Sequence, residues 1–257
     1  MRFVAAFLFA AFFLCGTAFA DEKLQMGVSV DAVPVASDFS GRDIVIFGAI
    51  ETDNQPALYR GEYDVIIEVI GEPTKAIVRK KDRIGGIWVN AAAREYQEVP
   101  SFYSVLSNKE LGDVADLSVL SVMGLGIDYL KAKPVDNGNI EEFLTQGEFS
   151  TALRRIRIED QLFHEDPASV QRLSPSLFRA TLPLPANMPI GDATVKGYLF
   201  HDGELIDQIE QSFLVEKVGF GSWIYNLAHQ YSLIYGILAV LLAIFTGWFA
   251  NLVFRKN

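Results

Sequence analysis

A dense group of basic side chains stands out in a chain whose formal net charge is −10 at pH 7. The group lies in a segment typical of a tight turn and comprises Arg79, Lys80, Lys81 and Arg83. Guanidinium and ammonium groups presented together bind phosphate, carboxylate or sulfate oxygens through charge-assisted hydrogen bonds. The group therefore predicts a contact with a small anion or a phospholipid headgroup. The alternative is a solvated turn with no binding function.

Aromatic side chains close to this turn form a second candidate set, an interaction patch. Its members are Trp88, Asn90, Phe102 and Tyr103. Exposed aromatic rings provide much of the binding energy at protein interfaces, and an amide beside them adds a hydrogen-bonding group. The alternative is that Trp88 lies in the hydrophobic core, as tryptophan commonly does in a β-sandwich.

A third group of cations, Arg154, Arg155 and Arg157, lies in a segment with helical spacing of its apolar residues. It predicts either a contact for an oxyanion or local salt bridges to Glu159 and Asp160. Both interpretations use the same donors, because a guanidinium binds any well-placed oxyanion.

The sequence contains no residues with the spacing of a catalytic, cofactor-binding or metal centre. His164, His201 and His229 lie far apart, and Cys15 is the single cysteine. The segment 219–223 lacks the G-x-S-x-G spacing of a serine hydrolase, and no phosphate-binding glycine loop is present. We therefore predict a protein that is not an enzyme and holds no metal or cofactor. The acidic net charge argues against nucleic acid as a partner.

The segments that position these groups begin with a first β block, residues 21–105. The apolar run 44–50 predicts a strand buried on both faces. In the segment 63–69 apolar residues alternate with Asp64 and Glu68, which predicts a strand with one apolar face. Residues 76–80 and 87–90 predict a hairpin that includes the basic group.

The next two segments differ in their periodicity. A helical insertion is predicted over residues 106–165, including a helix that begins near Asp113. A closing β block, residues 166–217, follows and contains the hairpin-turn signal Asp202-Gly203. The preferred architecture is a mainly β, immunoglobulin-like β-sandwich with the helices inserted between its two β blocks. Two separate small domains are the alternative.

Residues 232–254 contain no charged side chain. As a helix this segment would be roughly 35 Å long, enough to cross a hydrocarbon core of about 30 Å. Aromatic residues lie at both margins and Arg255-Lys256 follows, which is typical of the cytoplasmic side of a span. We therefore predict one C-terminal transmembrane helix in contact with the lipid bilayer, preceded by a membrane-edge hinge over residues 218–231.

The N-terminus has the composition of a secretory signal peptide. A positive start, an apolar core and the small-x-small sequence Ala18-Phe19-Ala20 predict a signal peptide over residues 1–20. Together with the span, this predicts a type I protein of the bacterial inner membrane. The β-rich part would be periplasmic and residues 255–257 would be a cytoplasmic stub.

Several of these segments resemble a family of uncharacterised alphaproteobacterial transmembrane proteins. The resemblance extends over essentially the whole chain, and its marks are residues 83–90, 100–103, 124–126, 178–180, 189–191, 198–203 and 235–255. It implies a single C-terminal span and an exported β-rich domain. Members of this family tend to be encoded beside sulfite exporters of the TauE/SafE type, which implies a role associated with transport.

Two functional hypotheses follow. The first is a non-catalytic accessory or interaction subunit of a transport or envelope complex, with a polytopic membrane protein such as a transporter as its partner. The second is a periplasmic domain that binds or senses a small anion through the basic groups. The span has no ionisable side chain and so offers no ion path, which makes it a tether or a docking helix.

Overall fold

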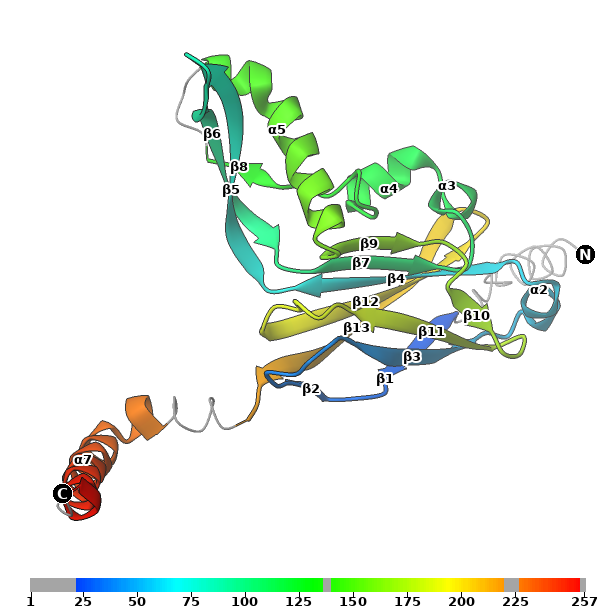
Figure 1. Ribbon diagram of the computed structural model, residues 1–257. Helices are drawn as coiled ribbons and strands as arrows, with labels where there is room; N and C mark the ends of the chain where they lie inside the picture. Colours follow the sequence, from blue (N-terminus) through cyan, green and yellow to red (C-terminus); the bar gives the residue numbers. More distant parts are fainter. Residues whose placement is uncertain (1–21, 136–139, 220–226, 255–257) are drawn as a thin grey trace, which may run out of the picture.

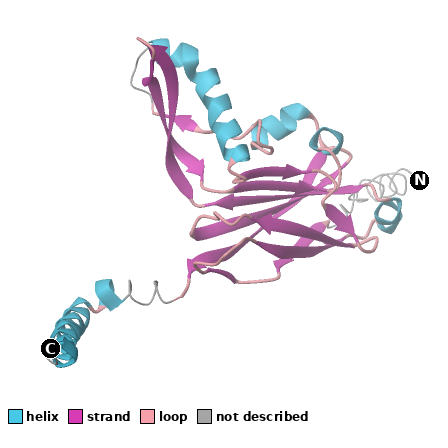
Figure 2. Cartoon of the chain, in the orientation of Figure 1, coloured by secondary structure: helices cyan, strands magenta, loops and turns pink. Residues whose placement is uncertain are grey.

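The computed structural model describes residues 22–135, 140–219 and 227–254 (Figure 1). The expected signal peptide, residues 1–20, and the expected cytoplasmic stub, residues 255–257, lie outside these ranges. So does the part of the expected hinge over residues 220–226. The described residues form a β-sandwich, a hairpin that projects from it, a set of helices on one side and a separate C-terminal helix (Figures 1 and 2).

One layer of the sandwich is a four-stranded sheet, sheet A, with the order β1-β3-β11-β10. Its strands pair antiparallel throughout and are β1 (Lys23–Val28), β3 (Arg42–Glu51), β11 (Leu177–Leu184) and β10 (Val170–Arg172). Because β10 and β11 come from the end of the domain and β1 and β3 from its start, both β blocks contribute to this sheet.

The other layer is a six-stranded sheet, sheet B, with the order β2-β13-β12-β4-β7-β9. Its strands are β2 (Ala32–Val35), β13 (Glu204–Lys217), β12 (Gly191–His201), β4 (Tyr63–Gly71), β7 (Tyr103–Ser107) and β9 (Phe163–Asp166). The inner faces of both sheets contribute to one hydrophobic core, which includes Ile46, Leu182, Val69 and Phe213. The prediction of a mainly β sandwich with a C-terminal apolar helix is confirmed.

The burial of β3 and β4 is the reverse of what the sequence predicts. Strand β3 alternates, with Ile44 and Ile46 buried and Phe47 51% exposed, so only one of its faces is covered. Strand β4 is buried on both faces, including Asp64 and Glu68. The reason is the helical insertion, which covers the outer face of sheet B and leaves sheet A uncovered.

The described residues of the insertion form three helices: α3 (Leu111–Val114), α4 (Leu117–Met123) and α5 (Ile140–Glu159). The single helix predicted to begin near Asp113 is therefore divided into α3 and α4, which are separated by extended backbone at Ala115 and Asp116. Leu120 and Leu125 from this region belong to the same core as the sandwich. A further short helix, α2 (Gln55–Arg60), connects β3 to β4.

The C-terminal helix α7 (Ser232–Phe254) has the bounds that the sequence predicts. Its apolar side chains are exposed where the structure describes them, and the candidate span Ser232–Asn251 is 0% buried within the chain. A helix that is apolar on all sides and does not pack on its own domain is stable in a lipid environment. This helix therefore supports anchoring of the chain in a membrane.

Candidate functional site: the hairpin arm

The most distinctive feature of the domain is a long hairpin that leaves the sandwich. Strands β5 (Pro73–Ile84) and β6 (Ile87–Pro100) pair with each other from Pro73↔Pro100 to Ile84↔Ile87. Their one other strand partner in the described chain is the two-residue strand β8 (Lys133–Pro134). We call residues 73–100 the arm. At about 3.3 Å per residue, the twelve residues of β5 give it a length of roughly 40 Å.

The base of the arm is supported by α5, which lies beside β5 and β6 (Figure 1). Val78 and Tyr96 of the arm are buried, and so are Phe149 and Leu153 of α5. The helix α5 continues beside the arm toward its tip (Figure 1), but the side chains from Arg79 to Trp88 are all exposed. Burial therefore ends partway along the hairpin, and the tip is exposed.

The tip is a two-residue turn, Gly85-Gly86, in which both residues have positive φ, 61° and 87°. Glycine adopts this conformation without steric cost, and the resulting turn matches the twist of a hairpin. Three large apolar side chains surround the turn, with Ile84 60%, Ile87 66% and Trp88 69% exposed. An apolar group at the end of a projecting element marks a contact surface.

The basic group that the sequence singles out lies on the arm just below the tip, and all four of its side chains are exposed. Lys80 lies on the side of β5 that faces α5, where its Nζ donates a hydrogen bond to Glu148 Oε1 at 2.7 Å. The pairing of β5 with β6 shifts register between Lys80 and Lys81, and beyond this shift Lys81 lies opposite Asn90 and Arg83 opposite Trp88. Arg79 and Lys81 have no ion-pair partner among the described residues.

The two basic groups predicted separately come together here. A hollow of about 240 Å³ lies between β5 and α5. Its lining contains four cations, Arg79, Lys80, Lys81 and Arg155, the carboxylate of Glu148, and the apolar side chains of Val78, Phe149 and Ala152. Arg155 also lies 3.8 Å from Glu159, which is the local salt bridge that the sequence predicts as an alternative. Arg154, which belongs to the same predicted group as Arg155, contacts Asp128 instead.

The four residues of the predicted interaction patch lie in two separate places. Trp88 and Asn90 are exposed on the arm, opposite Arg83 and Lys81 in the register of the hairpin. Phe102 and Tyr103 are buried at the start of β7 in sheet B. They do not form one surface, because the arm leaves the sheet between the two pairs.

Tyr103 belongs instead to a buried polar cluster that sequence reasoning missed. Tyr103 and Tyr198 donate hydrogen bonds to Glu68, Tyr103 Oη to Oε1 at 2.8 Å and Tyr198 Oη to Oε2 at 2.9 Å. The Gly126 amide donates to the Tyr103 hydroxyl at 3.1 Å, which attaches the segment after α4 to the cluster. The signal available in the sequence was a single carboxylate inside the apolar run 65–70, which must be hydrogen-bonded if the strand is buried.

Burial controls the protonation of this cluster. It raises the pKa of Glu68 because a charged carboxylate is disfavoured away from water, and the two tyrosine hydrogen bonds only partly oppose it. Burial also raises the pKa of Tyr103 and of Tyr198, with the negative charge of Glu68 as the next cause. Both tyrosines therefore remain hydrogen-bond donors at neutral pH, and the cluster stabilises the fold.

The opposite end of sheet B carries an acidic surface. A hollow of about 710 Å³ is lined by six carboxylates and one lysine: Glu62, Asp64, Asp113, Asp116, Asp202, Glu204 and Lys109. The rings of His201 and Tyr63 lie next to it in a tilted contact, with centroids 4.6 Å apart. Within the described ranges no three His, Cys, Asp or Glu side chains are arranged to hold a metal ion.

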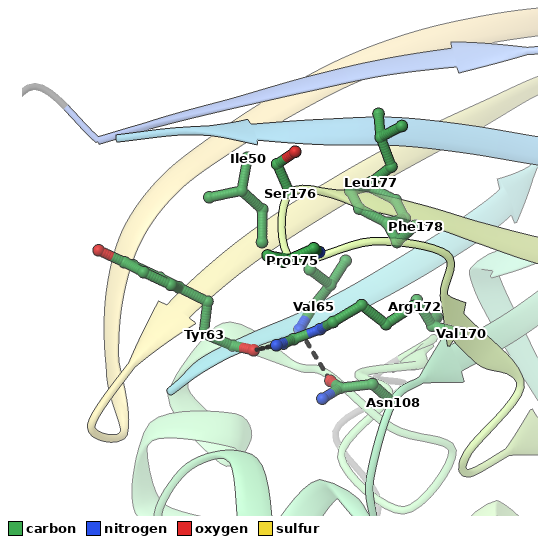
Figure 3. Close-up of a pocket in the computed structure, with 10 residues that line it drawn as sticks. All are labelled: Ile50, Tyr63, Val65, Asn108, Val170, Arg172, Pro175, Ser176, Leu177 and Phe178. Atoms are coloured by element: carbon green, nitrogen blue, oxygen red, sulfur yellow. Dashed lines mark hydrogen bonds between the residues drawn. The ribbon is translucent and has the colours of Figure 1, made fainter. Parts of the chain in front are cut away.

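A small pocket between the two sheets is a gap left by the packing of side chains (Figure 3). Arg172 Nη2 donates a hydrogen bond to the Tyr63 carbonyl at 2.7 Å, and the Val65 amide donates to Asn108 Oδ1 at 2.8 Å. Its internal space of about 10 Å³ is the volume that one water molecule needs. The pocket is too small for a ligand, and the Arg172 guanidinium and the Asn108 side-chain oxygen that line it are already paired.

Comparisons with known proteins support the assignment of α7 as a membrane helix. Residues 23–256 match the model of a family described as "Putative transmembrane protein (Alph_Pro_TM)". No curated protein matches the sequence. Among solved structures, the chain is similar to AggA, the major subunit of aggregative adherence fimbriae type I from Escherichia coli. The identity is 9% and the TM-score 0.27, with 77% of this chain and 96% of that chain covered.

Proposed function

Because this chain belongs to the family described as "Putative transmembrane protein (Alph_Pro_TM)", we propose that it is a membrane-anchored, non-catalytic accessory subunit of a transport or envelope complex. In this proposal residues 1–20 are a signal peptide that is removed, and the β-sandwich lies in the periplasm of an alphaproteobacterium. The helix α7 crosses the inner membrane with the C-terminus in the cytoplasm, which gives a type I topology.

The observation that carries the proposal is the arm. The two sheets close one core without the outer half of β5 and β6, so folding of the sandwich does not require the arm to project. Its exposed tip, with three large apolar side chains, has the form of a contact element. A contact element on an anchored domain is the expected architecture of a subunit that acts by binding.

The helix α7 provides the second contact surface of the proposed subunit. An added Cβ atom at Gly236 or at Gly247 would meet no other atom of the chain within 4 Å. Small residues of this kind allow close approach of a neighbouring helix in a bilayer. We propose a polytopic membrane protein, such as a transporter of the sulfite-exporter class, as the partner of this helix.

The test is a pull-down of the full-length protein from its native membrane in mild detergent. Three forms are compared: the natural chain, a chain in which residues 232–254 are replaced by an unrelated apolar span, and a chain with Ile84, Ile87 and Trp88 changed to serine. We expect a multi-span protein to co-purify with the natural chain and to be lost when the span is replaced. Absence of any specific partner from all three forms would contradict the accessory role.

A second candidate function is the binding of a small anion, and the hollow between β5 and α5 favours it. This hollow collects cations from two segments that are far apart in sequence, including Lys81 and Arg155. Titration calorimetry of the full-length protein with sulfate, sulfite and phosphate tests this function. Saturable heat that disappears in Lys81→Gln/Arg155→Gln supports it, and equal heat in both proteins contradicts it.

A further inference from the structure

The arm and the membrane anchor leave the sandwich at the same end. Strand β12 pairs antiparallel with both β4 and β13, so β4 and β13 run in the same direction. Ala193 of β12 lies opposite both Gly71, where β4 ends before the arm, and Phe213, near the end of β13. Figure 1 shows both strands ending at the same edge of the body. The chain therefore runs to α7 from the end of the sandwich that bears the arm.

Only fourteen residues, 218–231, separate the end of β13 from α7. A segment of this length spans at most roughly 50 Å when fully extended, which is close to the length of the arm. An anchored sandwich is thus held with its arm-bearing end within reach of the bilayer. Tethering of this kind makes even a weak second contact effective, because that contact becomes intramolecular.

The charge of the arm differs from that of the distal end of the sandwich. The arm carries six basic and three acidic side chains, a net charge of +3. At the far end, the hollow beside the β12–β13 turn is lined by six acidic side chains and one lysine. At that end His201 lies opposite Tyr63, the first residue of β4, and the nine residues of β4 separate this point from the arm. The arm is therefore basic, whereas the body is acidic both at the distal end and beside the base of the arm, where Glu72, Asp192 and Glu210 line a hollow with Lys196. An anionic surface would attract the arm and not the body.

The chemistry of the tip fits a lipid interface better than a protein. A stable protein interface buries about 800 Å² on each partner, whereas the tip is a convex two-residue turn with three apolar side chains. Tryptophan is stable at the headgroup level of a bilayer, where one end of the ring is apolar and the other is wet. Directly below it, Arg83 lies opposite Trp88 and Lys81 opposite Asn90, at the depth of headgroup phosphates.

We propose that the arm is a second membrane contact that binds anionic phospholipid. Ile84, Ile87 and Trp88 enter the interfacial region of the bilayer, and Arg79, Lys81 and Arg83 bind the phosphates. This inference rests on the proposed function, because it takes α7 as the anchor that holds the arm beside a bilayer. It names lipid as what the arm contacts, so that the arm serves the accessory subunit by orienting it on the membrane while α7 binds the protein partner.

The experiment uses the full-length protein in nanodiscs, in a Cys15→Ser background. Ile87→Cys carries an environment-sensitive fluorophore, and Tyr59→Cys on α2, an exposed residue near the distal end, is the matched control. The discs contain phosphatidylcholine alone or mixed with phosphatidylglycerol. We expect a blue-shifted emission for the arm label in the mixed discs, a smaller shift in phosphatidylcholine, and no shift for the control label.

Charge neutralisation tests the role of the cations. Each basic residue near an anionic surface strengthens binding roughly fivefold, so Arg79→Gln/Lys81→Gln/Arg83→Gln should lower the ratio of inserted to free arm about 100-fold. Circular dichroism confirms that this variant is folded. Raised salt should reduce the shift of the natural arm and leave that of the variant unchanged.

The alternative outcomes separate this inference from the proposed function. An equal shift in both lipid compositions would overturn the recognition of anionic lipid. The absence of a shift in either composition would overturn the membrane contact altogether. If the pull-down nevertheless recovers a partner that the serine-substituted tip loses, the arm binds protein and the accessory function stands. If the lipid shift is found but no protein co-purifies, the lipid contact stands without the accessory function.

Discussion

Two long hairpins of the domain have nearly the same local chemistry and opposite environments. The arm, β5–β6, turns at Gly85-Gly86, and the β12–β13 hairpin turns at Asp202-Gly203, where φ is 51° and 83°. All four turn residues thus have positive φ, the conformation that matches the twist of a hairpin. The turn therefore determines that each pair of strands forms a hairpin but not where that hairpin lies.

The environment follows from the side chains along the strands. Strand β12 lies between β13 and β4 and is largely buried, whereas β5 is exposed over most of its length. Charged residues occupy the outer half of β5, and burying them without partners would cost several kcal/mol each. The comparison teaches that the polar composition of the arm keeps it outside the sandwich, where it is available for contacts.

Truncation of a matched aromatic residue in each hairpin should show the largest contrast. Phe213 of β13 is 2% exposed, so Phe213→Ala should lower the free energy of unfolding by about 4 kcal/mol. Trp88→Ala on the arm should change it by less than about 0.5 kcal/mol, because that side chain is already in solvent. Denaturant unfolding of the full-length protein in detergent, followed by circular dichroism, measures both. Equal losses would show that Trp88 packs in the folded state.

Removing one carboxylate from the body and one from beside the arm should give the second contrast in stability. Glu68 accepts two hydrogen bonds in the interior. Glu68→Ala leaves the Tyr198 hydroxyl without its acceptor and leaves the Tyr103 hydroxyl only the Gly124 carbonyl at 3.3 Å, so it should cost about 3 kcal/mol. Glu148 pairs with Lys80 at the exposed side of the arm, and Glu148→Ala should cost less than about 0.5 kcal/mol. The same unfolding measurement compares them. A loss of more than about 1.5 kcal/mol in Glu148→Ala would mean that α5 and the arm form one tightly coupled unit.

The pH dependence of stability should come from the body and not from the arm. Burial raises the pKa of Glu68 in the folded protein above the 4.5 of an exposed glutamate. The folded state therefore binds this proton more readily than the unfolded state, and its contribution is fully present below pH 4.5. As the pH rises through the folded pKa, this contribution is lost.

Glu68→Gln removes the titrating group and should flatten the decrease of unfolding free energy above pH 4.5. Unfolding midpoints measured between pH 4 and pH 8 test this. Lys80→Gln on the arm is the control, and its profile should run parallel to that of the natural protein. A Glu68→Gln profile that also remains parallel would show that the slope arises elsewhere.

The features that the sequence predicts are those determined locally. Gly85-Gly86, Asp202-Gly203 and residues 232–254 indicate two turns and one apolar helix without reference to the rest of the chain. The face that a strand buries is different, because it depends on what covers the sheet. Strand β4 carries Asp64 and Glu68, yet it is buried on both sides because the insertion that follows folds back over it.

In the candidate site, too, the sequence predicts what depends on neighbouring residues and not what depends on the fold. The basic group is predicted from neighbouring residues alone, as cations gathered in a hairpin segment, and the arm presents it as an exposed group. The fold separates Trp88 from Phe102, although they are only fourteen positions apart in sequence. Trp88 is exposed near the tip of the arm, and Phe102 is buried in the sandwich at its base. The partners of Glu68 lie 35 and 130 positions away, and no local pattern contains such pairings.

Substitution of one turn glycine in each hairpin should give the smallest and most informative difference. Gly86 and Gly203 both have positive φ, so alanine introduces a similar local strain of about 1 kcal/mol at either turn. In the β12–β13 hairpin that strain must be relieved within the sheet, and the unfolding free energy should fall by nearly the full amount.

At the tip of the arm the added Cβ meets no other atom, and the turn can fray without unfolding the body. The global unfolding free energy of Gly86→Ala should therefore change by less than about 0.5 kcal/mol, while amide exchange accelerates in the outer residues of β5 and β6. An equal loss in both variants would mean that the arm unfolds together with the sandwich, and the two hairpins would then differ in position but not in stability.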